Sequence, residues 1–296
     1  FLMAACQKNL GVVFAIVAIL GTTIIDGDTK VQTVPRQRIV SLVPALTEIL
    51  FSIGAGHQVI AVSSFDDYPQ EALSLPRVGA LLDPDTERIL SLRPDLVLIY
   101  RSQDKLKNQL QRAGIETFNY FHTNLADIKR VFLELGSLTG HEAEAITQAS
   151  ALESKLTSIR ARVSGLPRPR TLLIIGHEPQ SLRNMDASGG LGFLHDLLDI
   201  AGGTNIFADV KQEAVRVSTE MLLSRKPEVV IDLHYQITGD TAKSITEQKI
   251  WERLLSIPAV STGRIYTLYG DYLVVPGPRM GEAAEILGRT LHPKAF

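Results

Sequence analysis

The stretch TERILSLRPDLVL (Thr86–Leu98) decides the fold, because it returns later in the chain as TEMLLSRKPEVVI (Thr219–Ile231). The two copies agree at Thr, Glu, Leu, Ser, Pro and Val, and their glutamates, Glu87 and Glu220, stand 133 positions apart in a chain of 296 residues. In each copy a hydroxyl and an acid precede apolar residues at helical spacing, and a proline separates these from an apolar run. This order predicts a short helix followed by a buried strand, once in each half of the chain.

Strands alternate with helices around both copies. The other predicted strands include the short apolar runs RIVSLV, VIAVS, RTLLIIG and RIYTLY, and LKNQLQRAGIETFNY predicts another helix and strand. Between them lie helical patterns, of which one begins at Pro44 and the last extends from Met280 to about Leu291. Alternation of this kind is typical of parallel sheets covered by helices on both faces. We therefore predict an α/β fold with two Rossmann-like lobes, each built on a parallel sheet.

One long helix is predicted between the two halves. From His141 to Val163, apolar residues recur three or four positions apart, as one face of a helix requires. This spacing divides the chain into an N-terminal segment (1–37), an N-terminal lobe (38–137), a connecting helix (138–166) and a C-terminal lobe (167–296). A single helix between lobes is a stiff connection, so we expect limited closure on ligand binding.

Composition excludes several classes of function. Hydrophobic residues make up 45% and charged residues 21%, which is ordinary globular content. The net charge is −2 with scattered basic residues, so a nucleic-acid partner is not expected. Cys6 is the only cysteine, which excludes zinc ribbons, iron–sulfur clusters and disulfide frameworks in the folded body.

The N-terminal segment has the layout of an export signal. The 17 residues from Asn9 to Ile25 are uncharged, with Lys8 before them and Asp26 after them. The run is nearly long enough for a membrane anchor. A lipoprotein-like box at Met3–Cys6 precedes the apolar run instead of following it. We expect a periplasmic or extracytoplasmic protein, whose signal is either cleaved or retained as an anchor.

Motifs of catalysis are missing from the sequence. It contains no Gly-x-Ser-x-Gly elbow and no phosphate-binding loop of the Walker type. The glycines of ASGGLGFLHDLL do not directly follow a predicted strand, so they indicate a loop before a helix and no dinucleotide site. We predict a binding protein with no catalytic residues. A membrane-tethered sensor of the same fold is the alternative from another class.

The order of segments resembles a known family. Arg38–Pro69, with SLVPALTEIL and SSFDDYP, is followed by the two repeat copies and by GDYLVVPGPRMGEAAEIL (Gly270–Leu287). This order is similar to the helical-backbone substrate-binding proteins of ABC importers, which are receptors for cobalamin, haem and ferric siderophores. The resemblance covers Arg38 to His292 and is strongest to the cobalamin-binding branch. It implies a monomer that delivers a corrinoid to an ABC permease dimer with its ATPase subunits, and no resident cofactor.

The resemblance gives the repeated glutamates a function. In that family each lobe presents one glutamate to arginines of the two permease subunits, and Glu87 and Glu220 match those positions. The alternative is helix capping, since acids and hydroxyls in a first turn satisfy free N–H groups for about 0.3–1 kcal/mol. Capping accepts Asp, Ser or Asn equally well, so glutamate at both sites favours docking.

Ligand contacts are expected where strands end between the lobes. Flat ligands such as corrins are held by apolar and aromatic surfaces with a few orienting polar groups. The predicted ligand-binding residues are Phe65, Tyr68, Leu81, Tyr100, His234, Tyr235, Asp271 and Tyr272. The family's cobalamin pattern has tryptophans and a tyrosine where this chain has Phe65, Leu81, Tyr100 and Ala214. The only tryptophan, Trp251, is predicted to pack under the second lobe.

Other ligands remain open at this point. Haem or a ferric siderophore is the alternative within the family, with iron ligands drawn from Tyr100, His177, His234 and Tyr235. In that case Arg101, Arg216 and Arg279 would attract anionic groups. His177 and His234 both follow strands, but isolated histidines are more often hydrogen-bonding residues, so no metal site is predicted. The seven histidines are not spaced as in zinc or manganese receptors.

Overall fold

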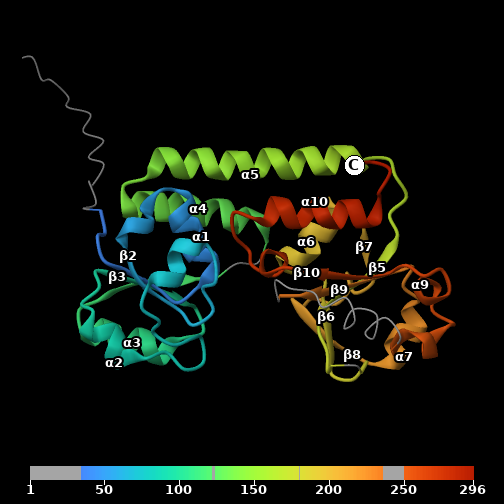
Figure 1. Ribbon diagram of the computed structural model, residues 1–296, viewed down its shortest axis with the longest axis horizontal. Helices are drawn as coiled ribbons and strands as arrows, with labels where there is room; N and C mark the ends of the chain where they lie inside the picture. Colours follow the sequence, from blue (N-terminus) through green and yellow to red (C-terminus); the bar gives the residue numbers. More distant parts are fainter. Residues whose placement is uncertain (1–34, 122–123, 180, 236–249) are drawn as a thin grey trace, which may run out of the picture. The chain divides into compact units, whose positions relative to one another are not determined.

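The computed structural model describes residues 35–121, 124–179, 181–235 and 250–296 (Figure 1). The predicted export signal and anchor, Asn9–Ile25, lie outside these residues. Within the described ranges, no helix is both long enough and apolar enough to cross a bilayer.

The N-terminal lobe is built on a four-stranded sheet in the order β2-β1-β3-β4, and all of its strand pairs are parallel. This confirms the predicted parallel sheet for the first half of the chain. Its elements are β1 (Ile39–Ser41), α1 (Pro44–Ser52), η1 (Ala55–Gln58), β2 (Val59–Val62), η2 (Gln70–Ser74), α2 (Thr86–Ser91), β3 (Leu96–Tyr100), α3 (Asp104–Arg112), β4 (Glu116–Tyr120) and α4 (Leu125–Thr139).

The C-terminal lobe is built on a larger sheet in the order β10-β9-β5-β6-β8, with β7 paired to β5. Strands β10, β9 and β5 are parallel, but β6 is antiparallel to both β5 and β8, which corrects the predicted all-parallel sheet. The elements are β5 (Arg170–Gly176), β6 (Met185–Ser188), α6 (Phe193–Ile200), β7 (Thr204–Asn205), β8 (Ala214–Val217), α7 (Thr219–Arg225), β9 (Val229–His234), η3 (Ile250–Leu254), α9 (Pro258–Ser261), β10 (Ile265–Tyr269), η4 (Asp271–Leu273) and α10 (Met280–Leu291).

The sequence repeat corresponds to α2–β3 in one lobe and α7–β9 in the other. In each lobe the repeat's strand pairs in parallel with the lobe's opening strand, β3 with β1 and β9 with β5. In both lobes an arginine at the start of the opening strand bonds the C-terminal end of the repeat helix. Arg38 donates from Nη2 to the carbonyl of Leu92 at 2.6 Å, and Arg170 donates from Nη2 to the carbonyl of Arg225 at 2.6 Å.

The connecting helix is α5 (Glu142–Val163), which contains no glycine or proline and is about 33 Å long at 1.5 Å per residue. Acidic residues occupy its first turn and basic residues its last, as the helix dipole favours. It packs on α4 from the N-terminal lobe and on α10 and α6 from the C-terminal lobe (Figure 1). Gly136 of α4 permits close contact, because a Cβ there would lie 2.5 Å from the Cβ of Ala145.

The core beneath α5 is shared by both lobes. Strand residues alternate between the two faces of each sheet, so that Leu98 and Leu233 point to the α5 side and Val97 and Val230 to the opposite side. On the α5 side, buried residues of both lobes form one continuous cluster, whereas each outer face has its own. Trp251 is buried in the outer cluster of the C-terminal lobe, as predicted.

Candidate functional site

An apolar hollow of about 410 Å³ lies at the carboxyl ends of strands in the N-terminal lobe. Three of the predicted ligand residues, Phe65, Leu81 and Tyr100, line it together with Leu82. Phe65 and Leu82 are 68% and 94% exposed, so the hollow presents large apolar side chains to solvent. The structure thus brings these three predicted residues into one surface.

A second hollow of about 340 Å³ lies in the C-terminal lobe. The predicted residue Tyr235 lines it, with Leu191, Ala214 and the strand residues Ile175 and Leu233. Most of this lining is apolar, and Tyr235 is 68% exposed. Both hollows therefore present apolar and aromatic side chains near the ends of β strands, where open α/β sheets place ligands.

A third hollow of about 500 Å³ shares one lining residue with each of the other two. It is lined by Tyr100, which also lines the N-terminal hollow, and by Glu213, which also lines the C-terminal hollow. Arg101, Tyr120 and Phe121 complete it, with the Arg101 guanidinium 5.2 Å from the centre of the Phe121 ring. We call these three hollows, which share the lining residues Tyr100 and Glu213, the groove. Its walls come from both lobes.

Tyr100 is the residue common to two parts of the groove, and its hydroxyl stays neutral. Burial, with a further contribution from the negative charge of Asp66, raises the pKa of Tyr100 to about 12. A neutral phenol both donates and accepts hydrogen bonds. Its ring makes an edge contact with Tyr120, whose centroid is 6.0 Å away. Tyr100 is thus fixed in place and able to bond either kind of polar group.

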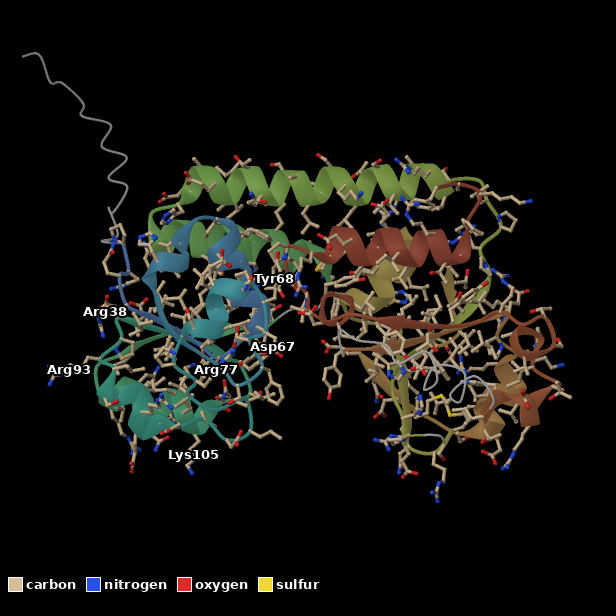
Figure 2. The ribbon with its side chains drawn as sticks, in the orientation of Figure 1. Arg38, Asp67, Tyr68, Arg77, Arg93 and Lys105 are labelled. Atoms are coloured by element: carbon tan, nitrogen blue, oxygen red, sulfur yellow. The ribbon has the colours of Figure 1, made fainter. Side chains whose placement is uncertain are left out.

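The loop that presents Phe65 is held by buried polar contacts. Asp66 is fully buried and accepts hydrogen bonds from the main-chain N–H of Ser63 at 2.7 Å and from the Ser63 hydroxyl. Arg77 donates from Nη1 to the carbonyls of Ser63 and Asp66 at 2.8 and 2.7 Å. Figure 2 shows Arg77 near Asp67, whose carboxylate lies 4.0 Å from its guanidinium. These contacts fix the loop so that the exposed Phe65 needs little ordering when a ligand binds.

Three further predicted residues, Tyr68, Asp271 and Tyr272, gather around Arg279 and line none of the three hollows. Asp271 accepts from Arg279 at 2.7 and 2.9 Å, and the guanidinium lies 3.8 Å from the Tyr68 ring centre and 5.8 Å from that of Tyr272. Burial would raise the pKa of Asp271, but the hydrogen bonds and charge of Arg279 outweigh it and lower that pKa. A ligand role for these residues remains a prediction.

Arg279 also joins the two lobes. It donates from Nη2 and Nε to Glu48 of α1 at 2.5 and 3.0 Å. Both side chains are largely buried, with 12% of Arg279 and 3% of Glu48 exposed. Burial raises the pKa of Glu48 despite the opposing effect of Arg279, which indicates that the carboxylate depends on this partner for its charge.

His234 lies with His177 and Asp232 in a cluster apart from the groove hollows. Asp232 Oδ2 is 2.9 Å from Nε2 of His177 and 3.1 Å from Nε2 of His234. Burial would raise the pKa of Asp232, but the hydrogen bonds and charges of the two histidines lower it overall. The sequence pointed to both histidines but not to the aspartate between them.

Glu87 and Glu220 occupy the same position in equivalent helices. Each is the second residue of its helix, after the N-caps Asp85 and Ser218, which accept from main-chain N–H groups three residues ahead. Each N-cap thus supplies one acceptor to the first turn of its helix, and both glutamates are exposed. Hydrogen bonding with Ser218 lowers the pKa of Glu220, so this carboxylate is charged at neutral pH.

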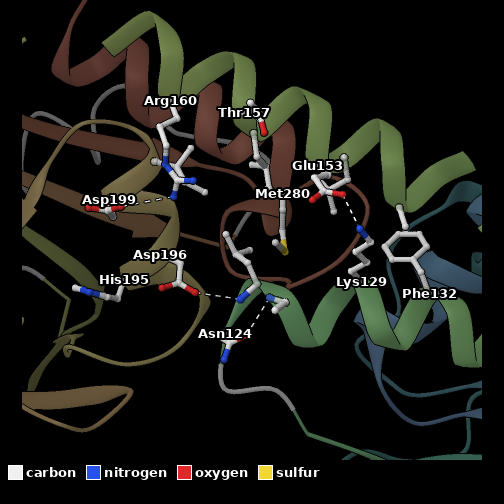
Figure 3. Close-up of a pocket in the computed structure, with 16 residues that line it drawn as sticks. Asn124, Lys129, Phe132, Glu153, Thr157, Arg160, His195, Asp196, Asp199 and Met280 are labelled. Atoms are coloured by element: carbon white, nitrogen blue, oxygen red, sulfur yellow. Dashed lines mark hydrogen bonds and ion pairs between the residues drawn. The ribbon is translucent and has the colours of Figure 1, made fainter. Parts of the chain in front are cut away.

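Another cavity, of about 530 Å³, lies between α4, α5 and α6 (Figure 3). Its margins are tied by Lys129 to Glu153 at 2.7 Å and by Arg160 to Asp199 at 3.6 Å. None of the predicted ligand residues lines it. Its lining comes mainly from the helices α4, α5 and α6.

Several groove residues escaped sequence analysis. Leu82, Leu191, Phe121 and Glu213 lie in loops, where periodicity gives no information on the direction of a side chain. An apolar pair, Leu81 and Leu82, directly before Asp83 and Pro84 was the one usable signal, since turns of that kind are usually polar. For Glu213 the sequence offers none.

The chain matches a known protein family over most of its length. The family described as periplasmic binding protein matches residues 39–272. The vitamin B12-binding proteins of Yersinia pestis (strain Pestoides F) and Yersinia pseudotuberculosis (serotype O:1b) are each 29% identical over 260 residues, covering 86% of this chain and 87% of theirs.

Solved structures agree with this match. The periplasmic vitamin B12-binding protein BtuF of Vibrio cholerae is 25% identical with a TM-score of 0.74, covering 87% of this chain and 97% of that one. A periplasmic haem-binding protein from Pseudomonas aeruginosa is 24% identical with a TM-score of 0.76, covering 88% of this chain and 94% of that one. At the latter identity the likeness concerns the fold alone.

Proposed function

Because the chain belongs to the periplasmic binding protein family, we propose that it captures cobalamin or a related corrinoid between its lobes. As in its relatives, the role is that of an extracytoplasmic substrate-binding component of an ABC importer. The relatives are transport proteins and not enzymes, which confirms the expected absence of catalysis. The ligand is the part that we propose.

The groove is the observation that supports a corrinoid most directly. A corrin is a broad, flat macrocycle with apolar faces and neutral amide side chains at its rim. The groove offers apolar and aromatic contacts from both lobes, including Phe65, Leu82 and Tyr235. Tyr100, with its neutral hydroxyl, and Glu213, with its carboxylate, each line two of the three hollows and can bond rim amides.

A rigid frame supports the same proposal. The lobes share one core beneath α5 and are joined by the buried Arg279–Glu48 ion pair. A frame of this kind holds its two walls at a nearly fixed spacing, because moving one lobe would disrupt packed side chains in the other. Binding then costs little reorganisation, and the ligand must fit a preformed space.

Haem or a ferric siderophore is the second candidate. The observation in its favour is the Arg101 guanidinium at the groove, which would attract the carboxylates of a porphyrin. Tyr235, which is 68% exposed in the C-terminal hollow, offers a phenol oxygen of the kind that binds ferric iron. The apolar N-terminal hollow fits the face of a porphyrin as well as that of a corrin, so the charged and phenolic groups are what distinguish this candidate.

For delivery, we infer that Glu87 and Glu220 dock the protein, as a monomer, on the permease dimer. Equivalent helices carry the two carboxylates at the same helical position, and both are exposed. A permease with twofold symmetry presents one basic site twice, and a receptor with two equivalent acids complements it.

Calorimetric titration of the purified protein with cyanocobalamin, and with hemin under the same conditions, tests the ligand. We expect one-to-one binding of cyanocobalamin. Phe65→Ala should weaken it about tenfold, since removing a buried aromatic contact costs on the order of 1–2 kcal/mol. Leu255→Ala is the matched control, because Leu255 is also 68% exposed but lies outside the groove.

Each other outcome has a definite meaning. Binding of hemin alone would replace the corrinoid with the second candidate. Binding of neither would reject both ligands and leave the family assignment intact. Equal losses in Phe65→Ala and Leu255→Ala would remove the groove from consideration as the site.

A further inference from the structure

The His177–Asp232–His234 cluster is assembled by strand geometry. Asp232 and His234 are two positions apart on β9, so their side chains leave the same face of the sheet. β5 lies next to β9 in parallel, with Ile174 opposite Asp232, and the chain continues past its end to His177. Three side chains of metal-binding types, two histidines and one aspartate, therefore converge at the carboxyl edge of two adjacent strands.

The converging atoms are close together and shielded from solvent. His177 Nε2 and His234 Nε2 are 2.9 and 3.1 Å from Asp232 Oδ2, and one ligand atom from each residue lies within 4.8 Å of the others. The exposed fractions of these side chains are 4% for His177, 4% for Asp232 and 20% for His234. The cluster is a buried site with one partly open side.

Hydrogen bonding fixes how His177 faces the aspartate. Its Nδ1 lies 2.7 Å from the main-chain carbonyl of Glu178, and because a carbonyl only accepts, Nδ1 must carry the proton. In the neutral ring Nε2 then carries a lone pair and no proton, and it lies 2.9 Å from Oδ2 of Asp232. Two electron-rich atoms at this distance need a positive charge between them, either a proton or a metal ion.

A metal ion suits this arrangement for two reasons. A histidine that binds a metal typically donates its other ring N–H to a carbonyl or carboxylate, as His177 does to Glu178. Asp232 Oδ1 is also buried, and it accepts no hydrogen bond from the part of the chain that the structure describes. A carboxylate 3% exposed with one oxygen so placed is stabilised more completely by a divalent cation than by a hydrogen bond to one oxygen.

We propose that His177 Nε2, Asp232 Oδ2 and His234 Nε2 bind a divalent first-row metal ion, with Zn²⁺ the preferred ion. Two imidazoles and one carboxylate are ligands typical of zinc with an open fourth position. Zinc–ligand bonds of about 2.0–2.1 Å in a tetrahedron place ligand atoms about 3.3 Å apart. The two short separations need to widen by only a few tenths of an ångström. The site is separate from the groove and does not depend on which ligand the groove binds.

Titration of the tag-free, chelator-treated full-length protein with Zn²⁺ tests the proposal. We expect one-to-one binding by calorimetry, and visible absorption bands of four- or five-coordinate Co²⁺ when cobalt is the probe. Asp232→Asn and His234→Gln should each weaken Zn²⁺ binding at least about tenfold and remove the Co²⁺ bands. His57→Gln is the control, because His57 is exposed and its ring hydrogen bond is to the main-chain carbonyl of Gly54.

The two variants separate misfolding from loss of a ligand. If Asp232→Asn fails to fold, His234→Gln, whose side chain is 20% exposed, provides the measurement. No stoichiometric Zn²⁺ binding to the unmodified protein would overturn the proposal. So would Zn²⁺ affinity that is the same in His234→Gln and in the control, because the ion would then lie elsewhere.

Discussion

The two lobes are alike at the repeat helices α2 and α7, which we propose as docking helices, and unlike at the carboxyl ends of the repeat strands β3 and β9. In each, an arginine at the start of the first strand bonds the end of the repeat helix, and its main-chain N–H donates to an acid before the repeat strand. Even the backbone strain is shared: Arg93 and Lys226, 133 positions apart, have φ of 48° and 46°. The two lobes therefore agree in backbone conformation as well as in side-chain contacts.

The inner ends differ at matching positions of the same repeat. Ile99 of β3 is buried among apolar side chains, whereas Asp232, 133 positions later in β9, lies between two histidines. A symmetric partner requires equal surfaces on both lobes, but an asymmetric ligand does not. On the proposed docking, the repeated unit keeps its likeness where it meets a symmetric partner and diverges elsewhere.

The largest expected effect breaks the likeness at the docking helices. Replacing Glu87 and Glu220 together with Ala should abolish receptor-stimulated ATP hydrolysis by the permease complex and leave corrinoid affinity unchanged. Each single variant should lose a similar part of the stimulation, because the two acids are equivalent. The matched control is Glu144→Ala with Glu252→Ala, two exposed acids outside the docking helices. Strongly unequal single variants would contradict the symmetric arrangement.

Next in size is the ion pair that joins the lobes. Arg279→Gln leaves Glu48 buried without its cation and should lower the free energy of unfolding by about 3 kcal/mol, measured by urea denaturation. Arg216→Gln removes the exposed pair with Asp186 and should cost less than about 1 kcal/mol. Two separate unfolding transitions in Arg279→Gln would show that this pair is what makes the lobes unfold together.

A smaller effect concerns the contact of α5 with the C-terminal lobe. Glu285 of α10 bonds Lys155 of α5 and Arg289, and these hydrogen bonds lower its pKa from 4.5 to about 2. A carboxylate with a lowered pKa in the folded state stabilises the protein above its unfolded pKa. We therefore expect its contribution, below about 1 kcal/mol, to be lost as the pH falls from 4.5 towards 2.

Urea denaturation at several acidic pH values measures that loss. The decline in stability should be shallower in Glu285→Gln than in the unmodified protein. Glu144→Gln is the control. It replaces an exposed glutamate of α5, the helix that carries Lys155, and should leave the slope of stability against pH unchanged. An unaltered slope in Glu285→Gln would show that Lys155 and Arg289 do not hold the carboxylate charged.

The smallest effect sharpens the likeness in backbone strain. Glycine adopts positive φ without steric cost, so Arg93→Gly and Lys226→Gly should each stabilise the protein by about 0.5 kcal/mol. Gln109→Gly, in the exposed part of helix α3, should instead destabilise it by about 1 kcal/mol. Thermal denaturation of the three variants decides the sign. Opposite signs at Arg93 and Lys226 would end the equivalence.

The sequence predicted what periodicity encodes. The repeat, the helices and the parallel strands followed from spacing and from Pro94 and Pro227, which separate each repeat helix from its strand. The antiparallel strands β6 and β8 were missed because they have only four residues each and contain charged side chains. Short, polar strands owe their pairing to neighbours that are distant in sequence.

The candidate site was predictable only in part. Phe65, Leu81 and Tyr100 adjoin recognisable strands and loops, and the structure places them in one hollow. The aspartate between the histidines was out of reach, because Asp232 and His177 are 55 positions apart and a buried acid in an apolar strand looks like an isolated exception. Contacts across strands depend on register, which a single sequence does not state.

The shared core beneath α5 has a consequence for signalling. If the two lobes keep a fixed spacing, the distance between Glu87 and Glu220, the proposed docking residues, is the same in the loaded and the empty receptor. The permease then cannot recognise cargo by the separation of its two contacts. An empty receptor competes for the same dock, so import should slow whenever receptor is abundant and ligand scarce.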